Sequence, residues 1–257
     1  SPRPFNYVEQ SDRHKEAFMR QITEKAQFLS FPSLLLQEWM QSYFPAVKGK
    51  SCVIPHQIKT DTELQPTPSF FIEHQFSLLH AGNLLQQRNP DFLIQGFLQF
   101  LANNPQAKGE AKLYFVGNYK KQESILKQYQ DNPALVVSDY IPYKIVQSLE
   151  KKAAVNIILE AISEISPFLP GKFPNCVVSN KPILVLGPYY SEVRRLLGKD
   201  YPYWSEANDV AAIEANITKL YRLWKENPQE LPLNRPDLTH YCDEKSLKKV
   251  LDGLSIA

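Results

Sequence analysis

Near-continuous apolar runs alternate with stretches in which apolar residues recur at helical spacing. The runs predict buried strands, and the stretches between them predict helices. The strand runs are residues 76–82, 112–117, 134–138, 153–159 and 182–186. Strands that are apolar throughout, rather than on alternate residues, are typical of a parallel sheet covered by helices on both faces. The pattern therefore predicts an α/β fold with a doubly wound, Rossmann-like parallel sheet.

The helices between these strands carry recognisable start signals. The first opens at Pro90, with Asn89 as the expected N-cap, because proline is tolerated in the first turn of a helix. Another is expected to open on Pro170-Gly171-Lys172. The remaining expected elements are helices over 121–130, 144–152, 191–197 and about 207–227, a short strand near 201–204, and a last amphipathic helix over 243–254.

The first part of the chain predicts a smaller unit. A charged amphipathic helix over 11–25 precedes an apolar run, a helix capped by Ser33, and a short strand over 51–55. This β-α-β piece is too small to be a domain. We expect residues 1–58 to be a partial N-terminal remnant, 59–75 a polar linker with prolines, 76–240 the main domain, and 241–257 a closing helix.

Composition excludes several classes of protein. Of 257 residues, 43% are hydrophobic and 22% are charged, as in globular proteins, and the net charge of +2 argues against a dedicated nucleic-acid binder. No run approaches the roughly 18 apolar residues of a membrane span. The opening residues show no signal peptide and no initiator Met, so we expect a piece of a longer protein. The unpaired Cys52, Cys176 and Cys242 suit a reducing cytoplasm.

The loops that follow the parallel strands are the expected binding site, because ligands bind at the carboxyl ends of such strands. The loops 80–88, 117–119, 138–143 and 160–172 should converge there. Arg88 and Lys172 are two cations on two of these loops, which suits a pyrophosphate. Each of the two cations could equally be an ordinary surface charge. His80, which lies at a strand end in the same region, could touch a ligand or be a structural residue.

Motifs for other chemistries are absent from the sequence. There is no GxGxxG, Walker loop, HExxH, EF-hand or Ser-His-Asp order. The sequence therefore predicts neither a bound cofactor nor a metal site.

Four segments together resemble the C-terminal, donor-binding half of GT-B glycosyltransferases, in the family-4-like group of bacterial polysaccharide enzymes. The segments are 77–97, 112–119, 135–159 and, most specifically, SPFLPGKFPNCVVSNKPILVLGP at 166–188. The resemblance implies a nucleotide-diphosphate sugar as donor substrate. It implies the following donor-binding residues: Gly82, Asn83, Arg88, Gly117, Tyr140, Ile141, Ser166, Pro170, Gly171, Lys172 and Asn175.

The chain departs from the family at its acidic positions. The family has two glutamates eight positions apart, and their counterparts here are Pro167 and Asn175. Glu164, three residues earlier, and Asn175 are therefore the candidate catalytic residues. Many members carry arginine where Asn83 stands.

The resemblance implies a transferase that moves a hexose from a nucleotide sugar to a saccharide or lipid-linked saccharide acceptor, with retention, in surface polysaccharide synthesis. It also implies that residues 1–58 are the last piece of the acceptor domain, on which the closing helix packs. Through that domain the protein is expected to reach the inner face of the membrane. The alternatives are a nucleotide-sugar epimerase on a related scaffold and a non-catalytic nucleotide-binding or interaction subunit.

Overall fold

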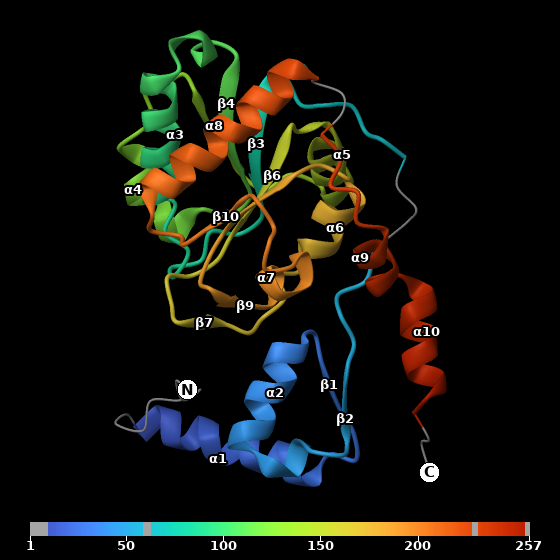
Figure 1. Cartoon of the computed structure of the whole chain (residues 1–257). Helices are drawn as coiled ribbons and strands as arrows, with labels where there is room; N and C mark the ends of the chain where they lie inside the picture. Colours follow the sequence, from blue (N-terminus) through green and yellow to red (C-terminus); the bar gives the residue numbers. More distant parts are fainter. Residues whose placement is uncertain (1–9, 59–62, 228–230, 255–257) are drawn as a thin grey trace.

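The computed structural model describes residues 10–58, 63–227 and 231–254 (Figure 1). Within them, a six-stranded sheet forms the centre of the main domain, and all its strands are parallel. In spatial order these are β10 (Trp204–Ser205), β8 (Ile183–Leu186), β6 (Val155–Leu159), β3 (Phe76–Ala81), β4 (Ala111–Val116) and β5 (Leu135–Ser138). The predicted parallel sheet is confirmed.

Helices cover both faces of this sheet (Figure 1), because alternate strand residues point to opposite sides. Phe76 and Leu78 of β3 face the helices α3 and α8, whereas Leu79 and Ala81 face α5. On the first face lie α3 (Asp91–Asn103), α4 (Glu123–Lys127) and α8 (Val210–Glu226). On the second lie α5 (Tyr143–Lys152), α6 (Phe173–Val178), α7 (Glu192–Leu197) and α9 (Pro236–Tyr241).

The order of the strands places a switch point between β3 and β6. From β3 the chain moves outward through β4 to β5, and then returns to the other side of β3 with β6, followed by β8 and β10. The loops after β3 and β6 therefore leave the sheet side by side in opposite directions. Doubly wound folds bind their ligands at this point.

Two glycines bring the loops after β3 and β4 together. Gly82 and Gly117 both have positive φ angles, of 131° and 130°. The N–H of Gly82 donates to the carbonyl of Val116 at 2.8 Å, and that of Gly117 to the carbonyl of Ser138 at 3.0 Å. A Cβ atom at residue 117 would lie 2.7 Å from the carbonyl oxygen of Gly82, so only glycine fits there.

Some predicted helix boundaries are wrong. The helix expected over 121–130 is a 3₁₀ turn, η3 (Lys120–Gln122), followed by the short α4. The helix expected on Pro170 begins instead at Phe173, because the Phe173 N–H closes a turn on the Pro170 carbonyl at 2.9 Å. Pro90, rather than Asn89, is the N-cap of α3, and Asn89 Oδ1 accepts the N–H of Asp91 at 2.8 Å.

The N-terminal piece has the predicted β-α-β order. It consists of α1 (Gln10–Lys25), β1 (Leu29–Phe31), α2 (Leu34–Tyr43), the 3₁₀ turn η1 (Pro45–Val47) and β2 (Ser51–Val53). The two strands are parallel neighbours, and a small core of Phe31, Met40, Phe44 and Val47 holds the unit together. Such a core is far smaller than that of a domain.

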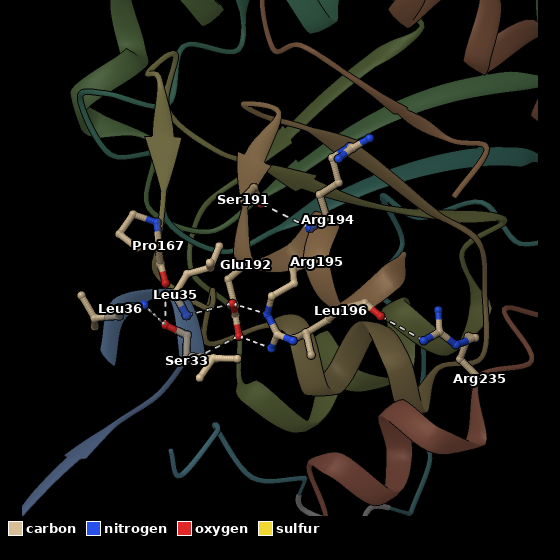
Figure 2. Close-up of polar contacts among 11 residues, drawn as sticks. Ser33, Leu35, Leu36, Pro167, Ser191, Glu192, Arg194, Arg195, Leu196 and Arg235 are labelled. Carbon is tan, nitrogen blue, oxygen red and sulfur yellow. Dashed lines mark hydrogen bonds and ion pairs between the residues drawn. The ribbon is translucent and has the colours of Figure 1, made fainter. Parts of the chain in front are cut away.

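A buried carboxylate joins this piece to the main domain (Figure 2). Glu192, at the start of α7, is fully buried and accepts the N–H groups of Leu34 and Leu35 at 3.1 and 3.3 Å. It also forms an ion pair with Arg195 at 2.7 Å. Ser33 Oγ donates to the carbonyl of Pro167 at 2.5 Å. The first turn of α2 thus provides N–H groups and positive dipole charge to an anion of another element.

The connecting and closing segments differ in how much they pack. Residues 59–62 of the expected linker lie outside the described residues, but further along it Phe71 is buried with its ring centre 4.8 Å from that of Tyr114. The last helix, α10 (Glu244–Asp252), contacts α9, and none of its side chains is buried. Its packing on the N-terminal piece stays a prediction.

Replacing Gly117 with alanine should destabilise the fold by about 2–4 kcal/mol, since both the positive φ angle and the Gly82 carbonyl oppose a Cβ atom. Gly82→Ala is the matched control, because it has the same φ strain but no atom within 4 Å of the new Cβ. Urea unfolding of both variants measures the difference. Equal losses of stability would contradict the close approach of the two loops.

Glu192→Ala should cost about 3–5 kcal/mol, because it leaves Arg195 and two helix N–H groups without their partner. Amide hydrogen exchange at Leu34 and Leu35 should accelerate as the N-terminal piece loosens. Asp237→Asn, which breaks an ion pair to Arg235 at an exposed carboxylate, is the control. Unchanged exchange at Leu34 in Glu192→Ala would show that this carboxylate does not hold the two units together.

Candidate functional site

Charged groups from separate loops gather at the switch point. Arg88, from the loop after β3, is half-buried, and its charge interacts with Glu160, which directly follows β6. The charges of Arg88 and Lys172 both act on His80, near the end of β3. The structure therefore brings together the loops after β3 and β6, as the sequence predicted.

Glu160 is the best-anchored group of this site. Its side chain is 3% exposed; Oε1 accepts the hydroxyl of Ser166 and Oε2 that of Ser191, each at 2.6 Å. Residue 187 has to be glycine, because a Cβ atom there would lie 2.5 Å from Glu160 Oε2. Burial raises the pKa of Glu160 to about 7, although the two serines and Arg88 favour the charged form.

His80 is completely buried, and neither of its ring nitrogens has a hydrogen-bond partner. Burial, and then the charges of Lys172 and Arg88, hold its pKa well below 6.5. The imidazole is therefore neutral at pH 7. An unpartnered buried polar side chain is costly, and such groups are enriched at functional sites.

Lys172 stands at the N-cap position of α6, partly buried. Its Nζ donates to the carbonyl of Ile157 in β6 at 2.9 Å. Burial, with a further contribution from Arg88, lowers its pKa to about 8. An anion placed beside Arg88 and Lys172 would favour the charged lysine, so the pair is suited to a phosphate group.

A second buried carboxyl, that of Glu150, also interacts with Lys172. Glu150, near the end of α5, is 2% exposed, and burial raises its pKa to about 8 against the opposing effect of Lys172. Asn175 also favours the charged form of Glu150. The Oδ1 of Asn175 accepts the hydroxyl of Tyr143 at 2.9 Å, so Asn175 interacts with α5.

The other predicted donor residues differ in burial. Gly82, Asn83 and Gly171 are exposed, Pro170 is buried, and Gly117 directly follows β4.

The predicted base-binding residues differ from one another. Tyr140 is 77% exposed, whereas Ile141 packs against the core cluster that contains Phe71 and Leu149. An exposed ring with an apolar neighbour can still accept a flat base.

Glu164 does not join the charged cluster. It is exposed and lines a separate pocket with Tyr189 and Tyr190. Of the two candidate catalytic residues, only Asn175 lies beside Lys172 and Glu150.

The two buried carboxyls, Glu160 and Glu150, are not among the site residues predicted from the sequence. A signal for Glu160 exists: an acidic residue ends the apolar run VNIIL at the expected binding edge. No such signal exists for Glu150, which lies on a charged helix turn, EKK, that reads as solvated surface.

Within the described residues, no group of three or more His, Cys, Asp or Glu side chains is arranged to hold a metal ion. The helices described there include none that is both long and apolar enough to cross a membrane.

Glu160→Gln should change how stability depends on pH. A carboxyl whose pKa is raised on folding to about 7 stabilises the fold when protonated, and this contribution is lost as pH rises from about 4 to 7. Relative to the variant, the wild type should therefore lose about 2–3 kcal/mol between pH 4 and pH 8. Urea unfolding across this range measures it, with Glu164→Gln, an exposed carboxylate, as control. Parallel curves for wild type and Glu160→Gln would contradict the raised pKa.

Comparison with known proteins rests on structure. No protein-family model matches the sequence, and no curated protein matches it. Among solved structures, a point mutant of TarM from S. aureus in complex with UDP, α-GlcNAc-glycerol and fondaparinux is similar, with a TM-score of 0.64 at 10% identity over 97% of this chain. The pneumococcal O-GlcNAc transferase GtfA, solved with UDP and GlcNAc, has a TM-score of 0.64 at 12% identity over 94%. WaaG, a glycosyltransferase involved in lipopolysaccharide biosynthesis, has a TM-score of 0.57 at 13% identity over 91%.

The match covers only part of each of these proteins: 48% of TarM, 47% of GtfA and 68% of WaaG. The chain thus spans about half the length of the first two. These neighbours are GT-B glycosyltransferases. The main domain of this chain accordingly has the Rossmann-like fold of a GT-B domain.

Proposed function

We propose that this chain is the donor-binding half of a glycosyltransferase, which moves a sugar from a nucleotide-diphosphate sugar to a saccharide acceptor. The observation that carries the proposal is the pair Arg88 and Lys172 at the switch point of a GT-B fold. Two cations from separate loops match the two charges of a pyrophosphate. A buried neutral histidine beside them is an additional polar group without a protein partner.

In this proposal the pyrophosphate lies between Arg88 and Lys172, close to the backbone of Gly82. Tyr140 and Ile141 flank the base. Cationic side chains, without a cofactor, stabilise the charge of the departing nucleotide. Release of Asn175 from Tyr143 would free its amide for a ribose hydroxyl.

The more specific features of the proposed function follow from the resemblance in sequence. They are transfer of a hexose with retention, a role in surface polysaccharide synthesis and contact with the membrane through an N-terminal domain. Because TarM and GtfA were solved with UDP, UDP is the first nucleotide to test.

One observation favours a second function, a nucleotide-binding subunit without catalysis. Neither position of the family's acidic pair is acidic here, and the Pro167 carbonyl is occupied by Ser33. Incubating the chain, extended by its native N-terminal domain, with donor and lipid-linked acceptor separates the two functions. Sugar transfer would exclude the second.

UDP should bind to the chain, and Arg88→Gln and Lys172→Ala should each weaken this binding by more than about tenfold, because each removes a charge beside the phosphates. Calorimetric titration with UDP, GDP and ADP measures both effects. Arg222→Gln, an exposed arginine on α8, is the matched control and should bind like wild type. If no nucleotide binds to the folded wild-type chain, the proposed function is wrong.

A further inference from the structure

A pocket of about 560 Å³ lies beyond Glu160, at the ends of β8 and β10. This volume is within the range of about 300–1,000 Å³ of small-ligand sites. The pocket is lined by residues from the loop after β6 and from the segments after β8 and β10. They are Ser163, Glu164, Ile165, Pro188, Tyr189, Tyr190 and Glu206.

Two exposed tyrosine rings form an aromatic wall of this pocket. Tyr189 is 52% exposed and Tyr190 is 67% exposed, and their ring centres lie 5.2 Å apart at an interplanar angle of 79°. The guanidinium carbon of Arg194 lies 3.9 Å from the centre of the Tyr189 ring, and Trp204 contacts that ring edge-on at 5.9 Å. Tyr189 is therefore held in place although half of it is exposed to solvent.

Two carboxylates accompany the rings. Glu206 accepts the backbone N–H of Tyr189 at 3.1 Å through Oε1, and Glu164 belongs to the loop after β6. Both residues are exposed. Their oxygens are hydrogen-bond acceptors at the edge of an aromatic surface.

Hydrogen bonds connect the two chain segments that line the pocket, those after β6 and β8, to the charged cluster. The short strands β7 (Ile165–Ser166) and β9 (Tyr190–Ser191) pair in parallel. Glu160 accepts a hydroxyl hydrogen bond from each of them, and its charge interacts with Arg88. The strands that carry two of its lining residues are thus linked through Glu160 to the edge where we place the donor phosphates.

We propose that this pocket is a subsite for a neutral saccharide. A sugar ring has an apolar face of C–H groups, which stacks on an aromatic side chain, and a rim of hydroxyl donors, which carboxylates accept. The same carboxylates repel a uronic acid or a phosphorylated sugar. The assignment of this saccharide as the acceptor rests on the proposed function, whereas its binding does not.

Binding is measured with the native chain by NMR, through the indole N–H of Trp204, which donates to the Gly187 carbonyl at 3.2 Å. The probes are maltotriose, cellotriose and triacetylchitotriose, with trigalacturonic acid as the anionic counterpart. At least one neutral probe should shift the Trp204 signal, and trigalacturonic acid should bind at least about tenfold more weakly.

Variants test the two halves of the pocket separately. Tyr190→Ala should weaken binding of the neutral probe by about tenfold, and Tyr190→Phe should retain it, because the ring supplies the contact. The double variant Glu164→Gln and Glu206→Gln should bind trigalacturonic acid more tightly than wild type. Phe18→Ala, at a 63% exposed ring on α1, is the control and should bind like wild type.

Two results would overturn the subsite: no neutral probe binding to the folded wild type, or Tyr190→Ala binding like wild type. UDP titration of the same variants separates this proposal from the proposed function. UDP binding without saccharide binding overturns only the subsite. Saccharide binding without nucleotide binding leaves the subsite and overturns the nucleotide-sugar function.

Discussion

The arrangement of this site depends on the hydrogen bonds that the carboxylate of Glu160 accepts. A parallel sheet ends its strands at one edge but does not fix the loops beyond them. Here the buried Glu160 side chain accepts one hydrogen bond from the hydroxyl of Ser166 and another from that of Ser191. These two bonds join the loops after β6 and β8. Its charge also acts on Arg88 from the loop after β3. Loss of this group would free two segments that line the edge.

Glu192 has a comparable role between the two structural units. From α7 it accepts N–H groups of the first turn of α2 in the N-terminal piece, and in the same region Ser33 donates to the carbonyl of Pro167 in the main domain (Figure 2). Pro167 precedes the turn that carries Lys172. The N-terminal piece is therefore connected to Lys172 of the proposed phosphate site through one hydrogen bond, from Ser33 to Pro167, and the few residues between Pro167 and Lys172.

The charged cluster at the switch point lowers the stability of the fold. His80 has no hydrogen-bond partner, and burial shifts the pKa values of Glu150, Glu160 and Lys172 toward their neutral forms. A core built only for stability would hold apolar side chains there. Groups with opposed and shifted pKa values at one strand edge are the pattern of a binding site, where an incoming anion supplies the missing partner.

The sequence by itself determined the sheet, the helices around it and the edge at which Arg88 and Lys172 meet. Local periodicity specifies buried parallel strands, and parallel strands have their carboxyl ends on one side. Only the tertiary structure decided that α6 begins at Phe173 and that Glu160, Glu150 and Glu192 are buried. Their partners lie far along the chain: Ser191 is 31 residues from Glu160, and Leu35 is 157 residues from Glu192. A hydrogen bond over such separations depends on the packing of the whole fold, which no local spacing of residues encodes.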